Sequence, residues 1–250
     1  MLSPEQRVEL TGLAGSSLDE AERVWDEVGD ALGLYEKFAA KAVPTLIPGH
    51  PFITEGQPKV DDFIAFVVDL RDSSKHLMQR ITRRTTDVTE LQRIYYETSA
   101  LLPVCSKVIG YHDGKVTEYL GDGLLALFHA SDAQRPQCIY DSYNAAQNSL
   151  EAMRSVVNPI LKDRYNLPPL EIGIGMALSK AVVTLVGLPE SALPKAFGKA
   201  VFYATKLSKG VDQIYVDEIL NSAWPAEKGG RLHFARENFG EYHGYLVTEG

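Results

Sequence analysis

The chain of 250 residues has little cysteine, no basic tract and no long apolar run. Its two cysteines, Cys105 and Cys138, are too few for a disulfide framework or a four-thiolate metal site, and both are expected to pack as small apolar residues on helix faces. No apolar stretch approaches the roughly 20 residues of a membrane span, and the polar N-terminus is not a secretory signal. These absences predict a cytoplasmic protein without membrane insertion.

The charge balance excludes another class of partner. There are 25 Lys and Arg residues against 33 Asp and Glu residues, a formal net charge of −8. Binding to a nucleic acid polymer depends on neutralising many phosphates, so that function is not expected. A small anion remains possible because backbone amides and a metal ion can hold it. With 45% apolar residues, the chain is long enough to bury a full core.

The first 55 residues differ in character from the rest. A capping-box pattern at residues 17–20 precedes apolar residues at helical spacing that continue towards Ala40. The stretch VPTLIPGHPFITEGQP then contains four prolines and two glycines, which neither a helix nor a central strand tolerates. The sequence therefore predicts a helical arm and linker over residues 1–55, suited to packing or dimerisation, and one domain over residues 56–250.

From residue 60 onward, strand-like and helix-like segments alternate. A buried strand is expected over residues 62–70, and Asp-Gly between two short apolar runs predicts a hairpin over residues 116–128. The segment 170–187 predicts two strands with a connection near Ser179, and the last two strands form a hairpin. Helices are expected after Ser73, over residues 88–109, over residues 137–157 with a break at Pro159, and from residue 199 to Gly210. This order predicts an α/β sandwich with a mixed sheet.

Two aspartates lie where they could bind a metal ion. Asp69 ends the buried strand, and Asp122 lies at the tip of the predicted hairpin. Two carboxylates from neighbouring strands provide the hard oxygen ligands that Mg²⁺ or Mn²⁺ prefer, together with substrate phosphates. The segment after Asp69 leads into a predicted helix, whose free N–H groups favour phosphate. The alternative to metal binding is that Asp122 serves only as a turn residue before glycine.

Four segments resemble class III nucleotidyl cyclases, the adenylate and guanylate cyclase superfamily. FIAFVVDLRDSS and VTEYLGDGLLALF resemble the two metal-binding segments of that family, and LGDGLLALF is the most specific match. EIGIGMALSKAVVTLVG resembles its Ile-Gly-Ile-Gly strand, and KAFGKAVFYATKL resembles its transition-state helix. The resemblance covers about residues 62–207, and the terminal hairpin extends it to residue 247.

The resemblance implies an α+β, ferredoxin-like domain with a mixed, mainly antiparallel sheet flanked by helices. It implies a head-to-tail homodimer with shared active sites, in which two divalent ions, Mg²⁺ or Mn²⁺, assist attack of the ribose 3′-oxygen on the α-phosphate of a nucleoside triphosphate. Asp69, Asp122 and the Leu70 carbonyl match the metal ligands. The backbone amides expected to hold the β- and γ-phosphates are those of Arg71, Asp72, Ser73 and Ser74.

Several positions depart from the family pattern. Glu118 replaces the base-reading lysine of adenylate cyclases, as in guanylate cyclases, and Lys195 occupies the second base-reading position. Phe202 replaces the transition-state asparagine, and Lys206 replaces the arginine. The late phosphate-binding Lys-Gly is Phe239-Gly240. By resemblance, Lys206 is the catalytic cation, supplied together with Glu118 and Lys195 by the partner subunit.

These departures favour a pyrimidine substrate. A glutamate accepts from a base N–H and a lysine donates to a base carbonyl, which suits uracil first and cytosine next, whereas guanine also fits and adenine fits less well. The ring of Phe202 would narrow the pocket towards a one-ring base. The chain is thus most similar to the stand-alone pyrimidine cyclases of the bacterial Pycsar anti-phage system, which make cyclic UMP or cyclic CMP as a signal for a downstream effector.

Plainer interpretations stay open. Glu118 and Lys195 are also compatible with surface positions that contact no base. Phe202 could instead pack in the core, and the Arg71 side chain could point to solvent. Purine cyclase activity is one alternative. Another is a degenerate, non-catalytic cyclase-like module that binds nucleotide or a partner, although both metal aspartates are retained. None of the six histidines lies at metal-ligand spacing from another.

Overall fold

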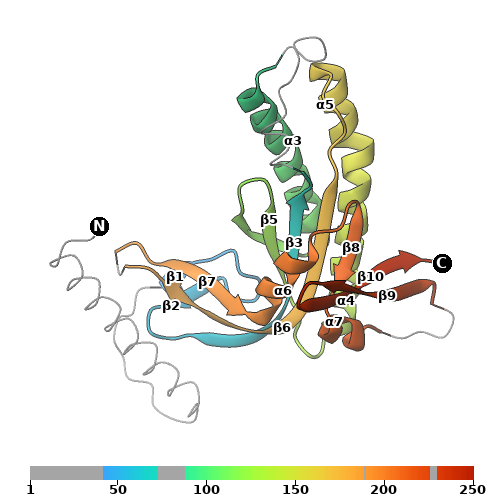
Figure 1. The fold of residues 1–250 in the computed structure, drawn as a ribbon. Helices are drawn as coiled ribbons and strands as arrows, with labels where there is room; N and C mark the ends of the chain where they lie inside the picture. The colour runs from blue at the N-terminus through green and yellow to red at the C-terminus, as the bar shows by residue number, and fades with distance from the viewer. Residues whose placement is uncertain (1–41, 73–87, 189, 226–229) are drawn as a thin grey trace. The chain divides into compact units, whose positions relative to one another are not determined.

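The computed structural model describes residues 42–72, 88–188, 190–225 and 230–250 (Figure 1). The helix expected in the N-terminal arm and the helix expected after Ser73 lie outside these ranges. The chain divides into two compact units. The first contains the segment ending at Thr45, Phe52–Val60 and Val182–Ala196, and the second contains Leu46–Pro51, Asp61–Ala181 and Phe197–Gly250.

The main sheet has eight strands in the order β4-β5-β3-β6-β8-β10-β9, with β7 paired to β6 off this path. Neighbours β3/β5, β4/β5, β8/β10 and β9/β10 are antiparallel, and β6/β8 is parallel. The strands are β3 (Lys59–Leu70), β4 (Lys115–Tyr119), β5 (Leu124–His129), β6 (Ile172–Val186), β7 (Leu193–Gly198), β8 (Gln213–Val216), β9 (Leu232–Phe239) and β10 (Tyr242–Glu249). The expected mixed, mainly antiparallel α+β architecture is confirmed.

The first unit contains a small two-stranded sheet within the predicted linker. Strand β1 (Ala42–Pro44) pairs antiparallel with β2 (Phe52–Thr54), with Val43 opposite Ile53. Each strand has only three residues, as expected where prolines remove backbone donors. The boundary at residue 55 stays a prediction.

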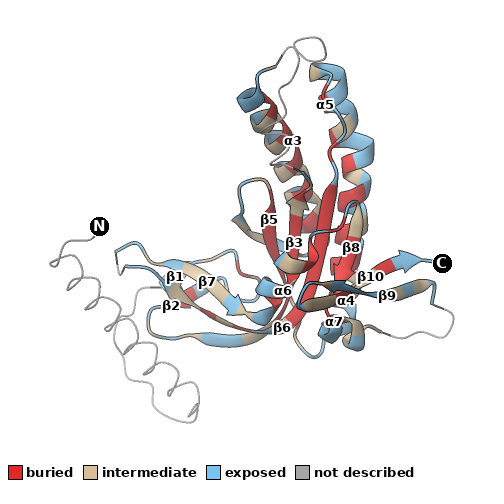
Figure 2. Cartoon of the chain, viewed as in Figure 1, coloured by how far each residue is buried: buried red, intermediate tan, exposed pale blue. Residues whose placement is uncertain are grey.

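Helices of the second unit pack on both faces of its strands. In β3, alternate residues Ile64, Phe66 and Val68 share one core with Leu101 of α3 (Glu90–Tyr111) and Ile139 of α4 (Arg135–Ala152). All positions from Phe63 to Val68 are buried, because both faces of this strand are covered. Figure 2 shows the same concentration of burial along β6.

The opposite face is closed by α6 (Lys199–Leu207). Gly173 and Gly175 of β6 alternate with core residues, so they face away from α3 and α4. An ideal Cβ on Gly175 would lie 2.0 Å from the Ala204 carbonyl oxygen, and one on Gly173 would lie 2.1 Å from the Ser208 carbonyl oxygen. The Ile-Gly-Ile-Gly pattern therefore lets the backbone of α6 and the residue after it lie directly against the sheet.

Two sequence-based expectations about local structure were wrong. Strand β6 runs without a connection at Ser179, whose hydroxyl oxygen accepts a 2.9 Å hydrogen bond from the Ala200 amide, and no glycine, asparagine or proline is present there to form a turn. Pro159 does not break the helix either. A π-helical turn, η1 (Met153–Val157), leads into α5 (Asn158–Tyr165), and Pro159 stands in the first turn of α5, where its missing N–H costs little.

The two cysteines are structural. Cys105 and Cys138 are free and buried, and burial raises the pKa of each thiol to about 12. Both thiols therefore stay protonated at neutral pH and pack as apolar groups, as the sequence predicts. Among the described helices, none combines the length and the apolar character that crossing a bilayer requires.

A buried carboxylate begins α7 (Glu218–Ala223) and gives the fold a pH dependence. Asp217 is 5% exposed, and its Oδ1 accepts from the Leu220 amide at 2.9 Å and the Leu178 amide at 3.2 Å. Burial raises the pKa of Asp217 from 3.8 to about 6, although these hydrogen bonds oppose the rise. Between these two values the folded state keeps a proton that the unfolded state has lost, so the free energy of unfolding falls as pH rises.

We expect the Asp217→Asn variant to lose this pH dependence. Asparagine keeps the acceptor oxygen but does not ionise, so the decrease of about 2 to 3 kcal/mol between pH 4 and pH 6 should disappear. Urea denaturation of both proteins across this range measures the effect. Asp217→Ala is the control, because it removes both accepted hydrogen bonds and should destabilise the fold at every pH. Parallel stability profiles for the wild type and the asparagine variant would contradict the expectation.

Candidate active site

The two predicted metal aspartates lie at the same end of the β3–β5 pair. Asp69 is the penultimate residue of β3, and Asp122 lies in the turn that joins β4 to β5. The antiparallel register places Val68 opposite Leu124, which brings that turn beside the end of β3. The two side chains therefore approach from adjacent strands, as the sequence predicts.

Glycines on both sides of Asp122 allow this approach. Gly121 has a φ of +81°, in the left-handed region that favours glycine. An ideal Cβ on Gly123 would lie 2.4 Å from the Val68 carbonyl oxygen and 3.4 Å from the Asp69 Cα. Gly123 is therefore needed for close packing of the turn against β3.

Arg71 connects Asp69 to the chain segment that follows α6. Its Nη1 lies 2.8 Å from Oδ2 of Asp69 and 2.9 Å from the Ser208 carbonyl oxygen. The Arg71 amide donates to the Glu171 carbonyl at 2.8 Å. This corrects one expectation, because an amide that already donates to the residue before β6 is not available to a phosphate. The guanidinium, rather than the amide, is the polar group that Arg71 brings to the site.

The charges around Asp69 favour binding of a cation. Burial raises the pKa of Asp69, Arg71 and Lys209 oppose the rise, and the negative charge of Asp122 adds to it. The carboxylates of Asp69 and Asp122 thus repel each other in a partly desolvated environment. A divalent ion relieves that repulsion, and carboxylate oxygens are the ligands that Mg²⁺ and Mn²⁺ prefer, so these residues fit the expected metal ions.

A cavity of about 600 Å³ brings the acidic and basic groups of the second unit together. Its volume lies within the range of small-molecule sites. Its polar lining consists of Asp69, Arg71, Thr205, Lys206, Ser208 and Lys209. The sequence pointed to Asp69, Arg71 and Lys206 but missed Lys209, which lies three residues after Lys206 and two residues beyond the end of α6. A second lysine so close to Lys206 in the sequence was the available signal.

Solved structures with similar folds include nucleotidyl cyclases. The guanylyl cyclase Cya2 is 19% identical with a TM-score of 0.61, and the match covers 76% of this chain and 92% of that chain. The adenylyl cyclase CyaB from P. aeruginosa is 14% identical with a TM-score of 0.62, covering 78% and 97%. The guanylate cyclase domain of RhGC from Catenaria anguillulae, solved in complex with GTP, is 13% identical with a TM-score of 0.57, covering 76% and 98%.

This chain therefore has the fold of a class III nucleotidyl cyclase catalytic domain. Because the identities are below 20%, the likeness establishes the fold, and the reaction of this chain is a separate question. No protein-family model matches the sequence, and a comparison with curated proteins gives no match.

Several other expected site residues of the cyclase fold lie outside the cavity lining. Glu118 is partly buried on β4, beside a register shift between Val116 and Glu118. Lys195 is partly buried on β7 and belongs to the first unit. Leu70 is buried, and Asp72 has a φ of +56°. Ser73 and Ser74 lie outside the described residues, so their expected phosphate contacts stay predictions.

Phe202 is not a core residue. It is 47% exposed on α6, and its ring makes edge-on contacts with Tyr203 and Tyr242, at centroid distances of 5.8 Å and 5.3 Å. The Nζ of Lys206 lies 5.4 Å from the centre of the Phe202 ring. Where the family resemblance places an asparagine, this chain thus presents an exposed aromatic cluster with a lysine over it.

Proposed function

We propose that this chain is a nucleotidyl cyclase that converts a ribonucleoside triphosphate to the 3′,5′-cyclic monophosphate and pyrophosphate. The observation that carries the proposal is the convergence of Asp69 and Asp122 at one end of β3, beside a cavity that also contains Arg71 and two lysines. This arrangement supplies oxygen ligands for cations and positive charge for a triphosphate within a cyclase fold.

Each group then has a defined role. Asp69, Asp122 and the Leu70 carbonyl hold the divalent ions, Mg²⁺ or Mn²⁺, which when bound stabilise the attacking and leaving oxygens of an in-line displacement. Arg71 orients the Asp69 carboxylate through its 2.8 Å contact. Lys206 and Lys209 hold phosphate oxygens and stabilise the charge that develops during attack, each as a point donor rather than a planar fork.

We propose a pyrimidine triphosphate as the substrate, UTP before CTP. Glu118 and Lys195 match a base with an N–H beside a carbonyl, and the exposed ring of Phe202 offers an apolar surface that favours a smaller base. The product would then be an intracellular signal in bacterial anti-phage defence, with a cyclic-nucleotide effector downstream. The resemblance to Pycsar cyclases supports this role, and GTP or ATP is the alternative substrate.

Incubation of the purified chain with Mn²⁺ and each of the four ribonucleoside triphosphates tests the proposal. We expect cyclic UMP as the main product by mass spectrometry, with cyclic CMP next. Cyclic AMP or cyclic GMP as the main product would overturn the base assignment and leave the cyclase proposal intact. Lack of any cyclic product would favour the alternative function, a non-catalytic cyclase-like module. The observation that favours this alternative is that Phe202 stands where the family has an asparagine.

We also propose a homodimer with shared active sites. It differs in one respect from the arrangement that the resemblance implies, namely in which subunit supplies Lys206. Lys206 lines the same cavity as Asp69 within a single chain, which differs from its expected supply by the partner. We therefore assign Lys206 to the site of its own chain, and we assign Glu118 and Lys195 to the partner's site.

Heterodimers of two different inactive variants test which chain supplies Glu118 and Lys206 to each active site. We expect Asp69→Ala chains mixed with Glu118→Ala chains to recover about half the activity of a wild-type dimer per verified heterodimer, because one of its two sites is intact. Asp69→Ala mixed with Lys206→Ala should recover nothing, since both residues serve one chain's site. Cyclase assays on purified heterodimers measure both. Recovery by the lysine pair would show instead that Lys206 serves the partner.

A further inference from the structure

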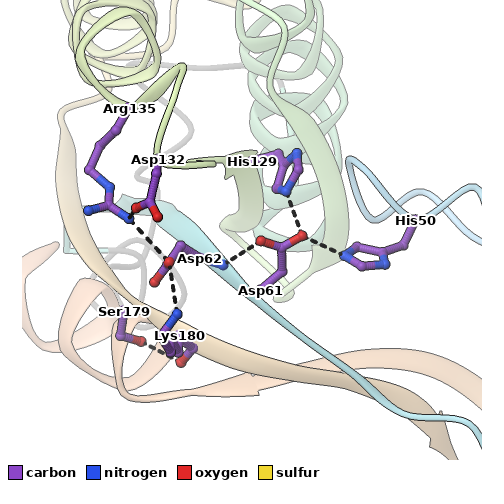
Figure 3. A network of polar contacts seen from close by, with 8 residues as sticks. All are labelled: His50, Asp61, Asp62, His129, Asp132, Arg135, Ser179 and Lys180. Carbon is purple, nitrogen blue, oxygen red and sulfur yellow. Dashed lines mark hydrogen bonds and ion pairs between the residues drawn. The ribbon is translucent and has the colours of Figure 1, made fainter. Parts of the chain in front are cut away.

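Three side chains of the kinds that can bind a metal ion meet far from the candidate active site. Nε2 of His129 lies 2.6 Å from Oδ2 of Asp61, and Nε2 of His50 lies 3.3 Å from the same oxygen. All three ligand atoms lie within 4.8 Å of one another, and no second group of this kind occurs among the described residues. Figure 3 shows both imidazoles pointing at one carboxylate. The spacing of the histidines along the sequence did not indicate this group, because it does not show which distant residues the sheet brings together.

The sheet and one glycine build this cluster, which we call the His-Asp-His cluster. His129 ends β5 opposite Phe63, so its side chain is on the same face of the β3–β5 pair as that of Asp61, two residues earlier on β3. His50 comes from the loop Leu46–Pro51, and Gly49 before it has a φ of +83°. An ideal Cβ on Gly49 would lie 2.8 Å from Nδ1 of His129, so glycine lets the loop rest on that imidazole.

The carboxylate is held in the orientation that a ligand needs. Oδ1 of Asp61 accepts a 2.9 Å hydrogen bond from the Asp62 amide, which leaves Oδ2 to face both histidines. Such contacts fix the direction of metal ligands in known sites.

We propose that His50, Asp61 and His129 bind one Zn²⁺ ion, with water as the fourth ligand. Two imidazole nitrogens and one carboxylate oxygen are a common zinc ligand set, and tetrahedral bonds of about 2.0 Å place ligand atoms about 3.3 Å apart. The observed separations of 2.6 Å and 3.3 Å need only a small adjustment of side chains to reach that geometry. The side chains are 13%, 31% and 28% exposed for His50, Asp61 and His129, so an ion and a water can enter.

This site is independent of the proposed cyclase chemistry. Asp61 and Asp69 lie near opposite ends of β3, eight residues and therefore roughly 27 Å apart. Nitrogen ligands select zinc over the magnesium or manganese that an all-oxygen site prefers. The ion ties the loop Leu46–Pro51 to the ends of β3 and β5, which gives it a structural role.

Zinc binding to the full chain tests the proposal without nucleotide. The protein is stripped with a chelator, freed of it, and loaded with Zn²⁺ in excess Mg²⁺, which occupies the oxygen site. We expect one zinc per chain after desalting, by elemental analysis. The melting temperature should rise by roughly 5 to 10 °C at a hundredfold excess over the Kd. Cobalt in place of zinc should give the intense visible absorption of a tetrahedral site.

Substitutions locate the ion. His50→Gln, His129→Gln and Asp61→Asn should each abolish zinc retention and the thermal shift. His243→Gln is the matched control, because His243 contacts a single carboxylate, that of Glu218, at 3.2 Å. Asp122→Asn should also keep its zinc, which separates this proposal from the cyclase proposal. Wild-type protein that retains no zinc and gives no cobalt spectrum would overturn the proposal, as would zinc retention unaffected by the three substitutions.

Discussion

Substitution of either Asp69 or Asp122 by asparagine should lower cyclisation at least a thousandfold while the fold persists. Asparagine keeps the size and one acceptor oxygen but removes the charge that holds a divalent ion. A two-metal reaction depends on both ions, so loss of one carboxylate should remove nearly all of the rate. The Asp69 side chain is 37% exposed and Asp122 is partly exposed in a turn, so neither charge is needed for the core.

Product formation by mass spectrometry, with urea denaturation alongside, measures both parts of this expectation. The free energy of unfolding should change by less than about 1 kcal/mol, since the asparagine side chains remain partly exposed. Asp132→Asn is a suitable control, because the Asp132 carboxylate is 90% exposed and pairs only with Arg135 among the ion pairs described here. Substantial activity in either active-site variant would mean that the metal ligands have been misassigned.

Gly123→Ala should reduce activity by about a hundredfold or more through geometry alone. The added methyl group would lie 2.4 Å from the Val68 carbonyl oxygen, so the turn that carries Asp122 must move away from β3. A displacement of about 1 Å between catalytic groups is enough for a loss of this size. The crowding should also lower the free energy of unfolding by about 1 to 3 kcal/mol.

The neighbouring glycine provides the comparison. Gly121→Asn places a side chain where no atom lies within 4 Å, and asparagine tolerates the positive φ of this position. We expect that variant to keep most of its activity. Steady-state kinetics at several metal concentrations compares the two. If Gly123→Ala behaves like Gly121→Asn, close packing of the turn against β3 does not position Asp122.

The parts of the fold that the sequence predicted are those governed by local patterns. The apolar run before Asp69 predicted β3, and Asp-Gly between two apolar runs predicted the β4–β5 hairpin. The same two patterns predicted that Asp69 and Asp122 lie near each other. Turn chemistry and strand periodicity act over a few residues, so they can be recognised without knowledge of the tertiary structure.

The features that the sequence did not predict depend on distant neighbours. The Arg71 amide is engaged by Glu171, and His50 meets His129 only because the strand register and a loop bring them together. Lys206 was expected in the partner's site, and only the packing of α6 shows that it faces the cavity of its own chain. The π-helical turn before Pro159 likewise has no sequence signal of its own, since it depends on how a long helix packs.

The burial of Cys105 and Cys138 makes this chain suitable for site-specific labelling. Thiol reagents attack the thiolate, and these two thiols are both shielded and protonated in the folded state. A cysteine introduced at an exposed position such as Leu91 would therefore react selectively with a fluorophore or spin label, without prior removal of the native cysteines. Slow reaction of the native pair would then report the opening of the core itself, on the timescale of rare unfolding events.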